Sequence, residues 1–181
     1  MNEPTVIDEI LNDFLREQFT QAMDLASQSD LVTVTPLRGR PPTQYVVEFR
    51  CKGLAKDARD KVVMIDGPWG FGVNFPANYV RGGFHVADVV AYLGPVPRPV
   101  HPNLRPPFVC FEVRPAMPLT EIIYTLYDFL TWNLFSTHDE GLAHDSAQWY
   151  RNQNPNRFPI DRRPLKRREL NLTVKPIDPK S

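Results

Sequence analysis

The amino-acid sequence predicts an α+β protein, and three observations lead to that class. Apolar residues recur every three or four positions in two long stretches, about residues 6–28 and 119–134, which is the spacing of helices that pack one face on a core. Between these stretches, short segments alternate apolar and polar residues as half-buried strands do. With 181 residues, the chain has the length of one domain with an extension and can bury a sizeable core.

The first helix is expected from about Val6 to Gln28. Its apolar positions share one face, and its polar face is acidic because Arg16 is the only basic residue before Asp30. The helix dipole favours acidic residues in the first turns. A partner that approached this face would therefore meet negative charge.

Four segments are expected to form an antiparallel meander of strands. Proline, glycine or charged turn residues separate them, and two of them, residues 31–35 and 44–51, alternate in polarity. The segments are 31–35, 44–51, 61–65 and 89–93. A break at Asp66-Gly67-Pro68 leads from the third segment into an aromatic stretch, and a loop is expected over residues 81–88.

A proline-rich stretch follows the last of these segments. Six of the thirteen residues from Pro95 to Pro107 are proline, and proline disrupts both helices and central strands. Cys110 therefore follows a stiff, irregular flap. Proline also reduces the entropy that a loop loses when it becomes ordered, which helps to hold a reactive group in place.

Two helices are expected after Cys110. The first, to about Leu134, is apolar almost all round and should be central, with Thr120 as its cap. The second should run from Asp139 to about Asn152.

The composition changes again beyond the second of these helices. We place one domain at 1–152 and a basic, proline-rich C-terminal extension at 153–181. The extension is expected to lie along the domain through four apolar side chains, namely Phe158, Ile160, Leu170 and Leu172.

Charge is balanced overall but unevenly spread. The chain has 21 Lys and Arg and 21 Asp and Glu, yet from residue 151 onward nine basic residues stand against three acidic ones. The balanced total gives no reason to expect a nucleic acid as partner. No apolar run reaches the roughly 18 residues of a membrane span, and no leading stretch resembles a signal peptide. We therefore expect a cytoplasmic protein that binds no membrane.

The two cysteines, Cys51 and Cys110, are too few for a disulfide framework or a zinc site. Cys51 falls in an alternating segment and is expected in the core. The sequence has no convincing metal-ligand spacing and no glycine-rich phosphate loop. No metal or cofactor is therefore expected, and any ATP would be used by a partner.

The most informative stretch places the tripeptide His101-Pro102-Asn103 shortly before Cys110. A side-chain amide near a cysteine can stabilise the oxyanion of an acyl-transfer intermediate, and a thiol is a good nucleophile at neutral pH. This stretch resembles the active site of ubiquitin-conjugating enzymes, in which a His-Pro-Asn tripeptide precedes the catalytic cysteine. Residues 75–79 are similar to that family's Phe-Pro-x-x-Tyr-Pro turn, with Val80 in place of the last proline.

The resemblance implies a ubiquitin-conjugating-enzyme-like fold, with an N-terminal helix, a four-stranded antiparallel meander, a cysteine flap and two C-terminal helices. It also implies a transferase that uses a cysteine nucleophile. Such an enzyme accepts a ubiquitin-like protein from an activating enzyme as a thioester, here on Cys110. It then passes the modifier to an amine of a target protein.

The resemblance also implies roles for other residues near Cys110. Asn103 would support the oxyanion or brace the flap, and His101 would hold the flap by hydrogen bonds. Asp139, in the loop after the central helix, would handle the proton of the acceptor amine, with His138 as a possible substitute. Glu112 is a second candidate for that task, since the family often has aspartate there.

The chain departs from eukaryotic members of the family, for example in its acidic first helix. In these departures it resembles the compact conjugating enzymes of bacterial operons such as the Bil system and CBASS antiphage systems. This likeness implies a role in bacterial antiviral defence. It implies a separate activating enzyme, and a small modifier or a modified cyclase, as partners.

Two other classes of function stay open. One is a catalytically silent binding module, like the related RWD domains, that would bind a ubiquitin-like protein or another partner without forming a thioester. The other is an unrelated cysteine hydrolase, which would need a histidine base for the thiol. The histidines are His85, His101, His138 and His144.

Overall fold

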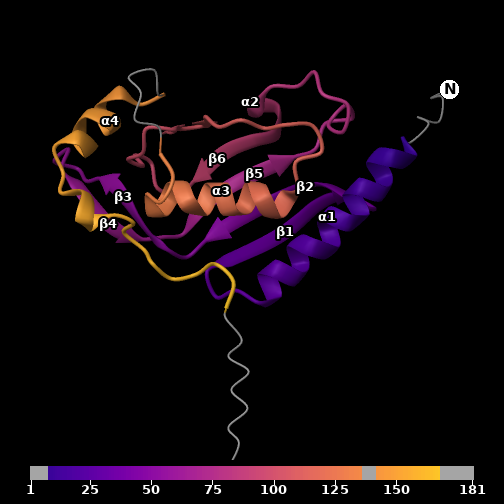
Figure 1. Ribbon diagram of the computed structural model, residues 1–181, viewed down its shortest axis with the longest axis horizontal. Coiled ribbons are helices and arrows are strands. Elements are labelled where there is room, and N and C mark those ends of the chain that lie inside the picture. Colours follow the sequence, from indigo (N-terminus) through magenta and orange to yellow (C-terminus); the bar gives the residue numbers. More distant parts are fainter. Residues whose placement is uncertain (1–7, 136–141, 168–181) are drawn as a thin grey trace, which may run out of the picture.

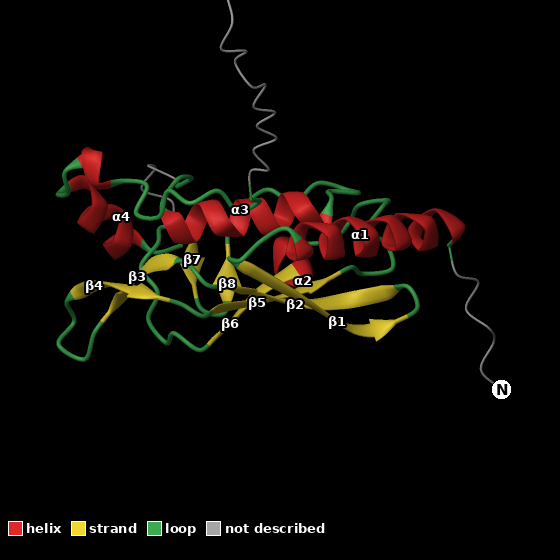
Figure 2. Ribbon diagram, turned by 90° about the horizontal axis from the view of Figure 1, so that it is seen from below, coloured by secondary structure: helices red, strands yellow, loops and turns green. Residues whose placement is uncertain are grey.

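The computed structural model describes residues 8–135 and 142–167 of the chain. It is an α+β structure with an N-terminal helix, antiparallel sheets and further helices, as the sequence predicts. Three helices are longest: α1 (Glu9–Ser27), α3 (Leu119–Thr131) and α4 (His144–Arg151). Helices α1 and α3 contact each other on one side of the main sheet (Figures 1 and 2). In the described part of the chain, no helix is long and apolar enough to cross a membrane.

The main sheet has four strands, and every neighbouring pair is antiparallel. Buried apolar side chains alternate along its inner strands, which is why these segments form strands that pack one face on α1 and α3. The order across the sheet is β1 (Val32–Gly39), β2 (Pro42–Phe49), β5 (Trp69–Asn74) and β6 (Val90–Gly94).

A separate antiparallel hairpin lies between β2 and β5 in the chain. It consists of β3 (Lys52–Lys56) and β4 (Val62–Asp66). The prediction that residues 61–65 form the third strand of the meander is therefore wrong, because β5 takes that place. The Trp69 indole occupies the bend between the two sheets: its Nε1 donates to the Cys51 carbonyl at 3.0 Å, and a Cβ on Gly53 would lie 2.2 Å from its ring.

Helix α1 begins at Glu9 because Asp8 caps it, with one carboxylate oxygen accepting the Ile10 N–H at 3.1 Å. On the buried face of α1, the Gln18 side chain accepts the Leu119 N–H at 2.9 Å and so caps α3. The prediction that Thr120 caps this helix is therefore wrong. The cap comes from a residue 101 positions away in the sequence.

Helix α3 is central, as its all-round apolar pattern predicts. Eight of its thirteen residues are buried. It ends at Thr131 rather than near Leu134, because Trp132 has left-handed backbone angles (φ 60°, ψ 33°). An aromatic residue rarely adopts that conformation unless its side chain is firmly held.

Several smaller elements differ from expectation. The expected loop over residues 81–88 ends in a short helix, α2 (Val86–Val89), and helix α4 begins at His144 rather than Asp139. Residues 136–141 lie outside the described part of the chain, and 142–143 are not helical. The flap contains two paired two-residue strands, β7 (Leu104–Arg105) and β8 (Phe108–Val109).

The part of the C-terminal extension that the structure describes, residues 153–167, packs on the domain. It starts with a single 3₁₀ turn, η1 (Pro155–Arg157). Phe158 and Ile160 are partly buried against an aromatic cluster made of Trp132, Phe135, Trp149 and Tyr150, and Leu165 is fully buried in the main core. Leu170 and Leu172 lie outside the described residues.

Candidate functional site

Cys110 is exposed and directly follows β8. One short antiparallel ladder holds the loop that precedes it: Leu104 pairs with Val109, and Arg105 pairs with Phe108. The prolines of the flap keep this segment out of the main sheet, so the cysteine is presented on an irregular loop. Among the described residues, no side chain forms a hydrogen bond or ion pair with the Cys110 sulfur.

Asn103 and Cys110 close this loop by exchanging hydrogen bonds. The Cys110 N–H donates to the Asn103 carbonyl at 2.8 Å, and the Asn103 side-chain Nδ2 donates to the Cys110 carbonyl at 2.9 Å. The Asn103 amide therefore fixes the backbone from which the thiol projects. Of the two roles implied by the resemblance, this contact corresponds to bracing the flap.

His101 lies beneath the loop and is almost completely buried. Its Nδ1 accepts the Asn103 N–H at 3.1 Å, so the ring proton is on Nε2, which donates to the Leu134 carbonyl at 3.0 Å. Burial lowers the pKa of His101 to about 3. The ring is therefore neutral near pH 7, and it connects the flap to the chain just after α3.

Trp132 supports His101 from below. Its ring lies 4.9 Å from the His101 ring in an edge-on contact, and its Nε1 donates to the Val100 carbonyl at 3.2 Å. The side chain is 1 % exposed. These contacts hold Trp132 in its left-handed conformation, and they tie the end of α3 to the start of the tripeptide.

A groove of about 560 Å³ lies beside the flap, between its β7 turn and the first residues of α4. Its polar lining comes from Lys56, Arg98, Arg105, His144, Asp145 and Ser146. Lys56 pairs with Asp145 at 2.7 Å, whereas the exposed Arg105 forms no ion pair within the described part of the chain. An extended segment that lay in this groove would meet a mainly basic lining.

The two residues expected to act on the acceptor proton, Asp139 and His138, lie outside the described residues. Glu112 is described and exposed, two residues beyond Cys110. Neither of the other described histidines is bonded to the thiol: the His85 backbone N–H donates to Asp88, and His144 begins α4. The described residues therefore show no histidine paired with Cys110 as a hydrolase base would be.

Cys51 has the opposite environment and lies in the core, as the sequence predicts. It is completely buried at the bend between β2 and β3. Desolvation raises the pKa of the Cys51 thiol to about 12, and the nearby Asp161 charge adds to that increase. A thiol in this position is protonated and inaccessible near neutral pH.

Within residues 8–135 and 142–167, no group of three or more His, Cys, Asp or Glu side chains is placed to hold a metal ion. Comparisons with known proteins found neither a family model nor a curated protein that matches the chain. The assignment of a function therefore depends on the geometry around Cys110 and on the resemblance of the tripeptide.

Sequence reasoning missed two residues beneath the flap, Trp132 and Phe158, as parts of the site. Trp132 follows the apolar pattern of α3, and Phe158 falls in the proline-rich extension, so neither has a local signal. The left-handed conformation of Trp132 depends on contacts with segments far away in the chain. A surplus of aromatic residues between 132 and 158 was the one available hint.

Proposed function

We propose that the protein is a ubiquitin-conjugating-like enzyme with a ubiquitin-conjugating-enzyme-like fold. It accepts a ubiquitin-like protein from an activating enzyme as a thioester on Cys110 and transfers it to an amine of a target protein. The observation that carries the proposal is the closed loop in which Asn103 and Cys110 exchange hydrogen bonds while Cys110 stays exposed. A core cysteine would need neither the exposure nor the brace.

The first chemical step is transthiolation. The Cys110 thiolate attacks the carbonyl carbon of the activating enzyme's thioester, a new C–S bond forms, and the enzyme's cysteine leaves as a thiolate. Both sulfurs are comparable leaving groups, so this exchange needs little driving force. An exposed thiol on a fixed backbone is suited to reach a second protein's thioester.

The second step is attack by an amine on the Cys110 thioester. A C–N bond forms, the C–S bond breaks, the amine loses a proton and the thiol is regenerated. Deprotonating a lysine of ordinary pKa near pH 7.4 costs about 4 kcal/mol. The proposal gives the proton to Asp139 on the basis of the resemblance, with His138 and Glu112 as substitutes.

Asn103 supports this second step in either of two ways. Its amide fixes the Cys110 carbonyl, which keeps the loop ordered while the tetrahedral intermediate forms. Small movements of the same side chain would bring an N–H donor to the oxyanion, as the resemblance implies. Neutral His101 orients Asn103 by accepting its backbone N–H.

The implied partners are a ubiquitin-like protein, an activating enzyme and a target with an acceptor amine. The likeness to operon-encoded bacterial enzymes favours a cytoplasmic role in antiviral defence. The acidic polar face of α1 favours an activating partner with a basic docking surface, unlike the partner expected for a basic first helix.

Intact-mass analysis after incubation with ATP, the activating enzyme and the modifier encoded beside the protein tests the proposal. The wild type should gain a thiol-sensitive adduct of one modifier. Cys110→Ser should give a thiol-stable ester or no adduct, and the matched control Cys51→Ser should charge as the wild type does.

A wild type that stays uncharged while the activating enzyme itself is charged would contradict the proposal. That outcome would favour the alternative, a catalytically silent module that binds a ubiquitin-like protein or another partner. Direct binding of the modifier, measured by titration calorimetry without ATP, would then distinguish that module from a protein with no such partner.

A further inference from the structure

The C-terminal strap, defined here as residues 158–167, crosses the helical side of the domain from the aromatic cluster at α4 to the end of α1 (Figure 1). Three hydrogen bonds to the strap backbone mark its path. The Ile160 N–H donates to the Thr131 carbonyl at 2.8 Å, and the Arg167 N–H donates to the Gln28 carbonyl at 2.9 Å. Between them, the Tyr127 hydroxyl donates to the Arg163 carbonyl at 2.6 Å. The strap is therefore bonded to α3 and to the end of α1.

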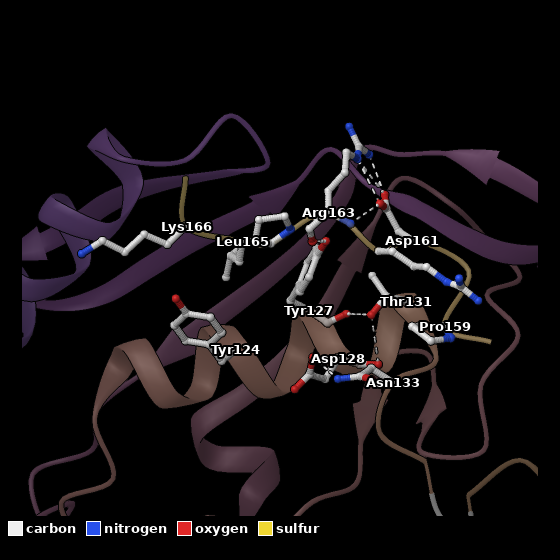
Figure 3. Close-up of a pocket in the computed structure, with 12 residues that line it drawn as sticks. Tyr124, Tyr127, Asp128, Thr131, Asn133, Pro159, Asp161, Arg163, Leu165 and Lys166 are labelled. Carbon is white, nitrogen blue, oxygen red and sulfur yellow. Dashed lines mark hydrogen bonds and ion pairs between the residues drawn. The ribbon is translucent and has the colours of Figure 1, made fainter. Parts of the chain in front are cut away.

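A buried carboxylate fixes the middle of the strap. The Asp161 side chain is 3 % exposed, and it accepts the Lys52 backbone N–H at 3.0 Å. The Arg163 guanidinium binds the same carboxylate at 2.5 Å (Figure 3). Since Lys52 belongs to β3, this anchor connects the strap to the hairpin that adjoins the flap.

The first residue of the strap, Phe158, completes the aromatic cluster under the flap. Its ring lies 5.4 Å from Trp132 and 4.9 Å from Tyr150. Trp132 is the residue that contacts His101 and bonds the Val100 carbonyl. Phe158 thus packs against Trp132, and the other contacts of Trp132 support the His101-Pro102-Asn103 tripeptide.

We infer that Phe158 is a positioning residue for Cys110, acting through Trp132 and His101. This inference rests on the proposed function for its role in catalysis. The contacts form one continuous series: Phe158 packs on Trp132, Trp132 packs on His101, and His101 accepts the N–H of Asn103. Asn103 then holds the Cys110 backbone from both sides.

The Trp132 backbone explains why this series is sensitive to Phe158. A left-handed aromatic residue is maintained only by its surroundings. Removing the Phe158 ring leaves a space beside Trp132, into which the indole can rotate. The indole would then move away from His101, and the flap would lose order although the rest of the fold remained.

The test compares three variants of the full chain. Phe158→Ala removes the contact, and Phe158→Tyr retains the ring at a position that is partly exposed. Leu165→Ala is the matched control, because Leu165 lies in the same strap but is buried in the main core, away from Trp132. Phe158→Leu serves in place of the alanine variant if the latter does not fold.

The first measurement is amide hydrogen exchange at Cys110, whose N–H is bonded to Asn103, with the Val47 amide of β2 as the reference for global stability. In Phe158→Ala, protection at Cys110 should fall about tenfold more than protection at Val47. Phe158→Tyr should restore it. In Leu165→Ala, the two amides should lose protection together.

Unchanged relative protection of Cys110 in Phe158→Ala, or an equal selective loss in Leu165→Ala, would overturn the inference. The exchange result does not require the modifier, so it decides the positioning role even if the wild type never forms a thioester. With a charged wild type, Phe158→Ala should also lower the rate constant for discharge to lysine while leaving the KM for lysine unchanged.

Discussion

Cys51 and Cys110 carry the same side chain in opposite surroundings. Cys51 is fully buried where β2 bends into β3, its carbonyl accepts both the Gly67 N–H and the Trp69 indole N–H at 3.0 Å, and its thiol pKa is raised to about 12 by desolvation. Cys110 is exposed on a loop that Asn103 closes. Hydrogen bonds hold the backbone of both cysteines, so the difference lies in the sulfur: core packing covers the Cys51 sulfur, whereas the Cys110 sulfur stays accessible.

The largest expected effect is the difference in reactivity between the two thiols. Under native conditions, iodoacetamide should alkylate Cys110 at least about a thousandfold faster than Cys51, because a buried, protonated thiol reacts only after local opening. Peptide mapping of alkylated protein over time measures both rates. Comparable alkylation rates would show that Cys51 is not shielded in solution and would contradict the proposed difference between the two thiols.

The polar support of the Cys110 loop should be visible in stability. His101→Ala should lower the free energy of unfolding by about 3 kcal/mol, since it removes a buried ring together with its hydrogen bonds to the Leu134 carbonyl and from the Asn103 N–H. Urea denaturation measures the change. His144→Ala, which alters an exposed histidine at the start of α4, is the matched control and should change the same quantity by less than about 0.5 kcal/mol.

The same histidine should make stability depend on pH. The unfolded chain takes up a proton at His101 below about pH 6.5, whereas the folded chain resists it until about pH 3. The folded state therefore binds fewer protons, and wild-type stability should fall as the pH decreases from about 6.5 toward 3. His101→Gln should lack this part of the decrease, and identical pH profiles would contradict a buried neutral ring.

The features of the fold and of the candidate site that the sequence could predict are those that depend on residues close together in the chain. The helical periodicity of α1 and α3, the strand alternation and the proline-rich flap are local patterns, and they gave the correct α+β class and the places of the two long helices. The pairing of Asn103 with Cys110 is also nearly local, because the two residues are seven positions apart.

Features that depend on contacts between residues far apart in the chain could not be predicted from the sequence. Gln18 caps α3 from 101 residues away, and Asp161 bonds Lys52 from 109 residues away. Residues 61–65 are a short, mostly apolar run that is typical of a strand, so their local pattern could not show that they would leave the main sheet for a hairpin. The left-handed Trp132 likewise depends on α4 and on Phe158, neither of which is near it in the sequence.

Removing the Asn103 side chain, which holds the Cys110 carbonyl, should slow transfer of the modifier to an amine. Asn103→Ala should slow discharge of the thioester to lysine by about a hundredfold, because both the loop and the implied oxyanion donor are lost. Single-turnover discharge measures this rate. Charging by the activating enzyme should change less, and an unaltered discharge rate would assign Asn103 a purely structural role.

The smallest expected effect concerns Asp161, whose carboxylate lies near Cys51. Asp161→Asn should lower the free energy of unfolding at pH 7 by about 2 kcal/mol, because a buried carboxylate loses its charged bonds to Arg163 and the Lys52 N–H. The Arg163 hydrogen bond lowers the pKa of Asp161 to about 2. The stabilisation is therefore present above about pH 4 and lost as the pH falls toward 2.

Matched measurements on Asp145→Asn separate this anchor from an ordinary surface pair. Asp145 pairs with Lys56 at 2.7 Å, but its side chain is 63 % exposed. The variant should change the free energy of unfolding by less than about 1 kcal/mol. Equal effects of the two substitutions would indicate that the Asp161 anchor is no stronger than a surface contact.

The most direct test of the account is discharge of the loaded wild-type protein to free lysine in a single turnover, followed by intact mass. The account predicts that the Cys110 thioester disappears at the rate at which a lysine adduct of the modifier appears, with Cys51 unmodified throughout. A thioester that is only hydrolysed, with no lysine adduct at any lysine concentration, would contradict transfer to an amine as the function of this site.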